Sequence, residues 1–195
     1  VCSSDLISDK KHFEGVFNKK EWLKKRITEG HVFRKLNVQG KVFVEYAPLE
    51  KAWLPIEGNG FLYIYCLWVA GSYKGKGIGK ELLEYAINDS KEKGMSGICT
   101  LTSKKKKPFV GEKKFFEHFG FKVVDTINDY ELLALRFDEK ETPRFNDSAR
   151  RMKIDDDEFT IYYSPECPYV EYEIHELTEY SKENDIRINF RSEEH

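Results

Sequence analysis

The sequence predicts an α/β protein, in which helices and strands are mixed along the chain and pack in layers. Phe61 to Val69 is continuously apolar and aromatic, which suits a central strand buried on both faces. The glycine-rich segment Gly71 to Gly79 follows it, and an amphipathic helix, Lys80 to Lys93, comes next and ends at Gly94. A buried strand joined to such a helix favours a sheet that is covered by helices.

Ahead of the central strand, the pattern predicts one helix and three strands. Lys19 to Thr28 carries apolar residues at helical spacing among charges, and Gly30 ends it. His31 to Leu36 and Lys41 to Tyr46 have the composition of two strands joined by a turn. Ala52 to Ile56 is predicted as a third, short strand because turn formers flank it.

The later part of the chain predicts two further groups of elements. The first group is a strand, a short helix and two antiparallel strands, over Ile98 to Thr102, Glu112 to Phe119, Phe121 to Asp125 and Tyr130 to Phe137. Asp138 to Asp157 holds a proline and many charges, which predicts a solvated linker. A second unit follows with a strand, a helix and the start of another strand, over Phe159 to Tyr163, Val170 to Lys182 and Ile186 to Phe190.

Composition and charge exclude several classes of protein. The 195 residues include 32 Lys and Arg against 34 Asp and Glu, and this net charge of -2 argues against a nucleic-acid partner. Hydrophobic residues make up 40%, which argues against disorder. The longest apolar run, Phe61 to Ala70, is about half of a membrane span, and the N-terminus lacks a secretory pattern. We therefore expect a cytoplasmic protein without a membrane partner.

The cysteines and histidines show no metal-binding pattern. The cysteines are scattered and lack metal or disulfide spacing: Cys2, Cys66, Cys99 and Cys167. Four histidines likewise show no ligand spacing: His12, His31, His118 and His175. We expect reduced thiols and no metal, with Cys66 as a small core residue rather than a nucleophile.

The glycine-rich segment has the composition of a phosphate-binding loop. Glycines let backbone N–H groups approach an anion closely, and a helix N-terminus adds partial positive charge. Lys74, Lys76 and Lys80 add full charges around it. The P-loop pattern fails because Lys74 replaces its first glycine and Glu81 stands where Ser or Thr is needed. The dinucleotide pattern G-x-G-x-x-G also fails, since from Gly75 its last position falls on Lys80.

Two blocks of the sequence resemble the GNAT superfamily of N-acetyltransferases. Lys74-Gly75-Lys76-Gly77-Ile78-Gly79 resembles its acetyl-CoA signature, Arg/Gln-x-x-Gly-x-Gly/Ala, with Lys in place of the usual Arg or Gln. Lys114 to Phe121 is similar to the late helix-to-strand segment of the family. Three further pieces resemble its YoaP-like branch: Trp53 to Glu57, Cys66 to Val69 and Ser103 to Phe109.

The resemblance implies a fold and a co-substrate. The GNAT fold has a central mixed, mostly antiparallel sheet, and its co-substrate is acetyl-CoA. The central strand is expected to lend backbone groups to the pantetheine arm, and the amides of Lys76 to Lys80 to hold the pyrophosphate. The residues implied to bind acetyl-CoA are Leu67, Trp68, Val69, Lys74, Gly75, Lys76, Gly77, Ile78, Gly79 and Lys80. A primary amine is expected to attack the thioester directly, without a metal.

Acetyl transfer requires a base for the ammonium proton and an acid for the departing thiolate. As the base we expect Glu45, on a strand near the cleft, with Glu57 as second choice. The family often supplies the acid as a tyrosine of the late helix, but the matching residue here is Phe116. Tyr130 is the expected acid, with Tyr73 or a water molecule as alternatives.

Two further segments suggest binding or redox roles. The run Lys104 to Lys107 either binds the 3′-phosphate of coenzyme A, binds an acidic partner, or is simply solvated. Phe159 to Tyr169 resembles the opening strand and active-site turn of glutaredoxin-like proteins, whose motif C-P-Y-C places its first cysteine at a helix N-terminus. Val170 replaces the second cysteine here, so Cys167 has either a monothiol role or a structural one.

Both ends of the chain resemble a sequencing adapter. Residues 1–6 and 191–195 can be encoded by DNA strings that are reverse complements over their shared length and resemble the adapter of short-read sequencing. We interpret residues 7–137 as an N-terminally truncated acetyltransferase domain and 138–157 as a linker. Residues 158–190 are interpreted as part of a thioredoxin-like βαβ module.

Three functions are consistent with these patterns. The first is transfer of the acetyl group of acetyl-CoA to a primary amine of a small molecule or a peptide. The second is binding of acetyl-CoA without catalysis, as in a sensor. The third is a monothiol redox module carried on an acetyltransferase-like domain. We expect the first.

Overall fold

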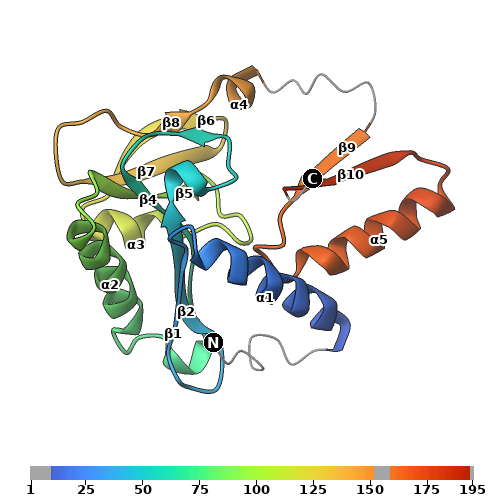
Figure 1. The fold of residues 1–195 in the computed structure, drawn as a ribbon, viewed down its shortest axis with the longest axis horizontal. Helices are drawn as coiled ribbons and strands as arrows, with labels where there is room; N and C mark the ends of the chain where they lie inside the picture. The colour runs from blue at the N-terminus through green and yellow to red at the C-terminus, as the bar shows by residue number, and fades with distance from the viewer. Residues whose placement is uncertain (1–9, 152–158, 194–195) are drawn as a thin grey trace. The chain divides into compact units, whose positions relative to one another are not determined.

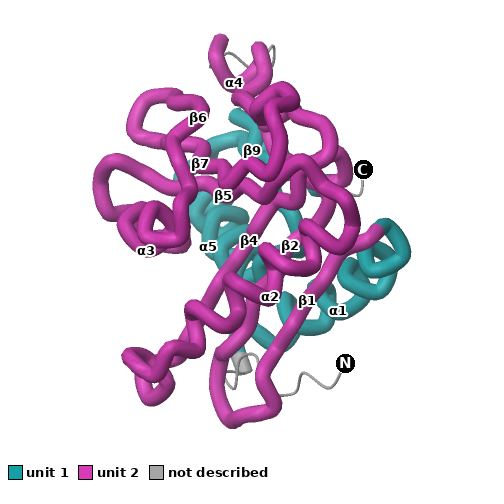
Figure 2. The backbone as a smooth tube through the Cα atoms, turned by 90° about the vertical axis from the view of Figure 1, so that its left-hand side faces the viewer, with its two compact units in different colours: residues 1–29, 154–195 teal, residues 30–153 magenta. Residues whose placement is uncertain are grey.

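The computed structural model describes residues 10–151 and 159–193. The chain divides into two compact units (Figure 2). One comprises residues 30–153, and the other comprises residues 1–29 together with 154–195. None of the helices in the described ranges has both the length and the hydropathy that a membrane span requires.

A six-stranded sheet forms the middle of the unit 30–153 (Figure 1). Its strands, in spatial order, are β1 (Val32–Lys35), β2 (Val42–Pro48), β4 (Phe61–Val69), β5 (Gly97–Ser103), β7 (Tyr130–Arg136) and β6 (Lys122–Ile127). Neighbouring strands are antiparallel except β4 and β5, which are parallel. The predicted α/β class with a mixed, mostly antiparallel sheet is therefore confirmed.

Helices cover one face of the sheet. α2 (Ile78–Glu92) presents Leu82, Leu83 and Ala86 to that face, where each is almost fully buried. α3 (Lys113–His118) adds Phe116, which is 3% exposed. Each buried side chain of leucine size contributes roughly 1.5–3 kcal/mol by removing apolar surface from water. This layer is the larger apolar core of the unit.

A second apolar core lies on the opposite face. It includes Phe61 of β4, Leu132 of β7 and the buried Phe145 of β8 (Arg144–Phe145). β8 pairs antiparallel with β3 (Ile56–Glu57), and α4 (Asp147–Arg151) follows it. Residues distant in sequence therefore close this side of the sheet.

Two predictions differ from the structure. Of the predicted strand Ala52 to Ile56, only Ile56 lies in a strand, β3, because η2 (Leu49–Lys51) ends in a turn that the amide of Ala52 closes by donating to the Leu49 carbonyl at 3.0 Å. In the segment Asp138 to Asp157, predicted as solvated, β8 and α4 form because Phe145 buries its ring. The acidic run at residues 155–157 lies outside the described residues.

The other unit combines the N-terminal helix with the C-terminal segment. α1 (Phe13–Ile27) begins six residues before the predicted start, after η1 (Lys10–His12). β9 (Phe159–Tyr163), α5 (Val170–Glu183) and β10 (Ile188–Ser192) form a βαβ unit in which the two strands are parallel. The predicted strand, helix and strand of this segment are therefore present. The expected domain boundaries at residues 137 and 158 stay predictions.

α1 packs closely on the turn that contains Cys167 and Pro168. A Cβ atom on Gly15 would collide with the Pro168 carbonyl, so this helix position requires glycine. The ring of His12 packs edge-on against that of Tyr169, with centroids 4.7 Å apart. The buried ammonium of Lys19 lies 3.7 Å from the Glu166 carboxylate. These contacts hold the helix against the turn.

Candidate functional site

β4 and β5 are paired over only half of their length. Their parallel ladder runs from Phe61 opposite Gly97 to Ile64 opposite Thr100. Both strands then continue, to Val69 and to Ser103, without further pairing between these described residues. A wedge therefore opens between the two central strands. In this part of β4, Leu67, Trp68 and Val69 have no ladder partner on β5.

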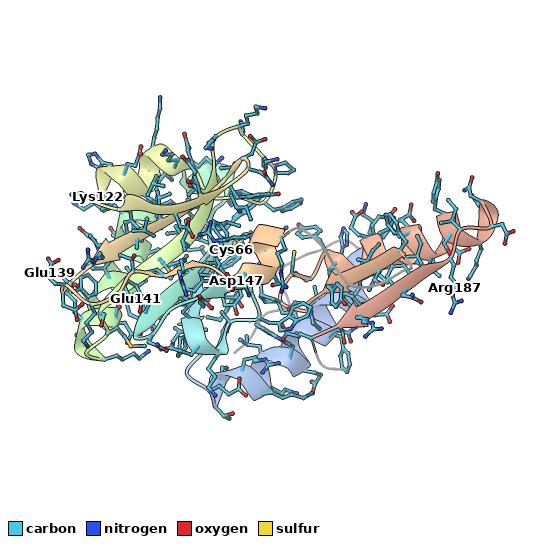
Figure 3. The ribbon with its side chains drawn as sticks, turned by 90° about the horizontal axis from the view of Figure 1, so that it is seen from above. Cys66, Lys122, Glu139, Glu141, Asp147 and Arg187 are labelled. Atoms are coloured by element: carbon cyan, nitrogen blue, oxygen red, sulfur yellow. The ribbon has the colours of Figure 1, made fainter. Side chains whose placement is uncertain are left out.

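A β-bulge in β4 accounts for the divergence. Glu45 of β2 lies opposite Cys66, whereas its neighbour Tyr46 lies opposite Ile64, so Tyr65 is the extra residue. A bulge bends its strand and increases the local twist. Because β4 stays paired with β2 as far as Val69, the bend turns it away from β5. Cys66, labelled in Figure 3, marks this position on the strand.

The glycine loop joins the open end of β4 to α2. Gly75 and Gly77 have φ of 75° and 80°, in the left-handed region that favours glycine. Gly77 caps α2, whose first internal bond runs from the Glu81 amide to the Gly77 carbonyl at 3.2 Å. The amides from Gly77 to Lys80 precede that bond and lack partners within the helix. They form a group of N–H donors at a positive helix end.

The predicted coenzyme-binding residues lie around this group of amides. Leu67 and Val69 lie opposite Val44 and Val42, which belong to the core under α2, so both share that face. Trp68 is 43% exposed and lies on the other face. The first turn of α2 lies beside the end of β4, since a Cβ on Gly79 would be 3.7 Å from Val69 and from Phe115 of α3. The other members of the predicted set are exposed, apart from half-buried Ile78: Lys74, Gly75, Lys76, Gly77 and Lys80.

Glu45, the predicted base, is fully buried and paired. Its carboxylate lies 2.8 Å from Nε2 of His31, and both side chains are at most 2% exposed. The His31 ring lies 5.4 Å from the ring of Tyr65, the extra residue of the bulge. Glu45 lies on the face opposite α2, because Val44 and Tyr46 point toward α2. A buried His–carboxylate pair therefore adjoins the bulge.

His31 is a candidate that sequence reasoning did not assign. Phe33 lies directly opposite Glu45, and His31 is two residues before it, so the two share one face as diagonal neighbours. The predicted strands over residues 31–36 and 41–46 placed His31 and Glu45 on neighbouring strands, but the register was needed to bring them together. That register is the signal that sequence alone did not supply.

Tyr130, the predicted acid, lies at the far side of the wedge. It begins β7 opposite Ser103, is 38% exposed, and has the ammonium of Lys107 5.1 Å from its ring. It shares the face of Glu45, because its neighbour at i+2, Leu132, belongs to the core opposite α2. β4 and β5 separate the two residues, which makes about 14 Å at the usual strand spacing. Glu45 and Tyr130 therefore cannot both touch one reacting carbonyl.

The alternative residues occupy other places. Glu57 of β3 lies 2.7 Å from the Arg144 guanidinium, at the amino end of β4 rather than at the wedge. Tyr73 lies in η3 (Gly71–Tyr73) with the Lys76 ammonium 5.5 Å from its ring, beside the glycine loop. Phe116 is a buried core residue. Only Glu45 of the two predicted bases adjoins the bulge.

A model of the acetyltransferase (GNAT) family matches residues 7–121, which is more than half of the chain. The chain belongs to this family. The expectation of an acetyltransferase is confirmed at the level of the family. A curated relative, the uncharacterized N-acetyltransferase YoaP of Bacillus subtilis (strain 168), is 40% identical over 190 residues. The match covers 96% of this chain and 75% of the relative, which supports the YoaP-like branch.

Solved structures of N-acetyltransferases are among the distant structural neighbours of this chain. PaiA N-acetyltransferase from Thermoplasma acidophilum, in complex with coenzyme A, is 20% identical with a TM-score of 0.47. The alignment covers 67% of this chain and 81% of that one. The ribosomal-protein-S18-alanine N-acetyltransferase from Escherichia coli is 14% identical with a TM-score of 0.43, over 63% and 79% of the two chains. The family assignment rests on the family model and the curated relative.

Proposed function

We propose that this GNAT protein transfers the acetyl group of acetyl-CoA to a primary amine by direct attack. The observation that carries the proposal is the wedge: the β4–β5 ladder stops at Ile64 and Thr100 beside a glycine loop that caps α2. The wedge leaves backbone donors and acceptors of β4 for an extended ligand, and the loop leaves amides for its phosphates. Acetyl-CoA has both parts.

Coenzyme A binds by its arm and by its pyrophosphate in this proposal. The pantetheine arm lies along Leu67, Trp68 and Val69, whose backbone bonds it as an added strand would. The pyrophosphate lies on the amides of Lys76 to Lys80, where donors and the helix dipole favour negative charge. Lysines 74, 76 and 80 add charge around it.

The His31–Glu45 pair serves as the base. An incoming ammonium gives one proton to the buried pair through water, because the paired imidazole and carboxylate together stabilise an added positive charge. The free amine then attacks the acetyl carbonyl carbon, a C–N bond forms, the C–S bond breaks, and the nitrogen releases its second proton. On the β5 side of the wedge Tyr130 gives a proton to the departing thiolate through a chain of water molecules, and the proton released by the nitrogen returns to Tyr130 through solvent.

Acetyl-CoA binding by Gly77→Ala tests the proposal. Alanine at φ of 80° is strained, so the loop shifts and its amides lose their arrangement. We expect acetyl-CoA affinity to fall at least tenfold by calorimetry. Gly94→Ala is the matched control, because Gly94 has φ of 66° at the other end of α2 with no atom within 4 Å of an added Cβ. Equal acetyl-CoA affinity in the two variants would contradict the proposal. Absence of turnover with a broad panel of amines would contradict catalysis and leave only the function of acetyl-CoA binding.

A second function is proposed for the C-terminal βαβ unit, as a thioredoxin-like module. Its support is the place of Cys167, in the turn between β9 and α5 and directly before Pro168. With Val170 in place of a second cysteine, Cys167 acts as a monothiol or structurally. Burial raises the pKa of the Cys99 thiol and makes it an internal reference. A Cys167 that alkylates no faster than Cys66 would remove the monothiol role.

The interpretation of the chain ends as adapter-derived also stays a proposal. Residues 1–6 lie outside the described residues, whereas Arg191 and Ser192 continue β10. The coding DNA tests it directly, because codons other than the adapter-like strings at both ends would contradict the interpretation.

A further inference from the structure

The segment that follows β5 lies at the open end of the wedge and has no role in the proposed reaction. β4 and β5 are parallel, so their carboxyl ends lie at the same edge of the sheet. The glycine loop follows β4 at this edge, and residues 104–112 follow β5. We call residues 104–109 the lysine loop. The glycine loop and the lysine loop therefore lie on the two sides of the opening.

The lysine loop carries positive charge that its neighbours compensate only in part. Residues 104–114 and 128–131 contain six lysines and three carboxylates, in a chain whose net charge is -2. Asp129 lies 3.8 Å from the ammonium groups of both Lys105 and Lys107, so one carboxylate serves two lysines. The Lys105 side chain is 80% exposed. Lys106 is exposed and has no ion pair with any residue that the structure describes.

Exposed aromatic side chains lie among these charges. Phe109 is 78% exposed, and its φ of 61° is a left-handed conformation that is unfavourable for a bulky residue. Tyr130 is 38% exposed and lies beneath the ammonium of Lys107. Aromatic side chains are frequent anchors of binding surfaces, and clusters of cations recognise acidic segments.

We propose that the lysine loop binds the acceptor, and that the acceptor is an acidic polypeptide segment. This inference rests on the proposed function and names its substrate class. Carboxylates of the segment pair with Lys105 and Lys106, and an apolar side chain packs on Phe109. A segment held there presents its amine at the edge where the wedge opens. A polypeptide has the length to contact the lysine loop and to extend its amine to the wedge at the same time.

The same lysines also have the charge to bind the 3′-phosphate of acetyl-CoA, and the test separates these two anions. Lys105→Glu/Lys106→Glu is compared with Lys91→Glu/Lys122→Glu, which reverses two exposed lysines on α2 and β6. Lys122, labelled in Figure 3, begins β6 opposite Ala134, several residues away along the sheet from Tyr130. The full chain is assayed with acetyl-CoA and with acetyl-dephospho-CoA.

Peptides with one common amine, flanked by Asp and Glu, by Gln or by Lys, serve as acceptors. We expect kcat/KM for the acidic peptide to fall about tenfold in Lys105→Glu/Lys106→Glu and to stay within about twofold in the control variant. Neutral peptides should be unaffected, and added salt should reduce the difference. Binding of the acidic peptide, measured by fluorescence anisotropy without turnover, should weaken in parallel.

The two readouts separate this inference from the proposed function. Weakened peptide binding in the loop variant without turnover in any variant would support the lysine loop and contradict the transferase. Turnover with unchanged peptide binding would overturn the lysine loop alone. A loss confined to acetyl-CoA and absent with acetyl-dephospho-CoA would assign the lysines to the 3′-phosphate and overturn the inference. Lysine-dependent binding to phosphatidylserine vesicles, without peptide binding, would also overturn it.

Discussion

The two neighbours of β4 hold it in different ways. β2 pairs with it from Val42 opposite Val69 to Pro48 opposite Leu62, with one bulge. β5 pairs with it only as far as Ile64 and Thr100. The first side supplies the ladder that stabilises the strand, and the second leaves the backbone positions where we propose that the pantetheine arm binds. One strand therefore belongs to both the core and the candidate site. The bulge lies between the part of β4 that pairs with β5 and the part that does not.

A side chain added at Gly97, in the paired half of β4 and β5, should have the largest effect on stability. A Cβ on Gly97 would lie 2.5 Å from the Leu135 carbonyl oxygen and from the Phe61 ring. Gly97→Ala should lower the free energy of unfolding by about 3 kcal/mol, because backbone and a buried ring must move. Urea denaturation measures this. Gly71→Ala, with no atom within 4 Å, is the control and should stay within about 0.5 kcal/mol.

Removing the Glu45 carboxylate should slow catalysis, because it belongs to the proposed base on the β2 side of the wedge. Glu45→Gln keeps the size of the side chain but removes the carboxylate that pairs with His31. We expect kcat to fall about a hundredfold, as for loss of a general base, with little change in the KM for acetyl-CoA. Steady-state kinetics decide it. Glu57→Gln, at the Arg144 ion pair, should retain full activity; the reverse ranking of the two variants would assign the base to Glu57.

Acid should loosen the outer edge of the sheet without affecting the wedge. Asp125 of β6 is partly desolvated by burial, which opposes ionisation, but bonds from Arg150 and from the Phe145 and Thr126 amides hold its pKa below the ordinary value. A depressed pKa contributes stability above the unfolded-state value, and that contribution is lost as pH falls through the folded-state value. Asp125→Asn should therefore cost about 1–2 kcal/mol at pH 7 and nothing at low pH.

Thermal unfolding of the wild type and of Asp125→Asn, at pH values from 7 down to low pH, measures that difference in stability. Acetyl-CoA affinity at pH 7 should be equal in both, because Asp125 fastens β8 and α4 rather than the wedge. A constant difference between the two proteins at every pH would contradict the assignment of the effect to Asp125 ionisation.

Removing the Thr100 hydroxyl, at the last paired position of β4 and β5 before the wedge, should have the smallest effect. The Thr100 hydroxyl donates to the Ile64 carbonyl at 3.1 Å, and the side chain is buried. Thr100→Val should lower stability by about 1 kcal/mol, the usual net value of one such hydrogen bond. Because the wedge begins just beyond it, the KM for acetyl-CoA should change less than twofold. A change in this KM above tenfold would mean that the hydrogen bond between Thr100 and Ile64 determines where the wedge begins.

Local patterns in the sequence predicted the central elements well. Phe61–Val69 coincides with β4, and α2 begins only two residues before the prediction, because a long apolar run and a strong helical period are local signals. β3 and β8 could not be predicted in this way. Each has two residues, and they form only because Ile56 and Phe145, distant in sequence, meet across one face.

The candidate site was predictable where it depends on sequence order and not where it depends on register. The glycine loop lies between β4 and α2 as expected, because Gly75 and Gly77 are needed at positive φ. The pairing of His31 with Glu45 depends on which residues of β1 and β2 face each other, and the wedge depends on a one-residue bulge at Tyr65. Neither has a compositional signature.

The contact between Gly15 and Pro168 has a consequence for synthesis of the chain. α1 leaves the ribosome early, yet the turn on which it packs is made about 150 residues later, some 8–30 s at usual translation rates. The unit of residues 30–153 has all its strands before then. During that interval α1 lacks the turn on which it packs, and Trp22 lacks Glu193, to which its indole N–H donates in the finished unit. The first helix to be synthesised is therefore among the last to be folded, and a nascent chain stalled before residue 168 should be cleaved by protease within α1.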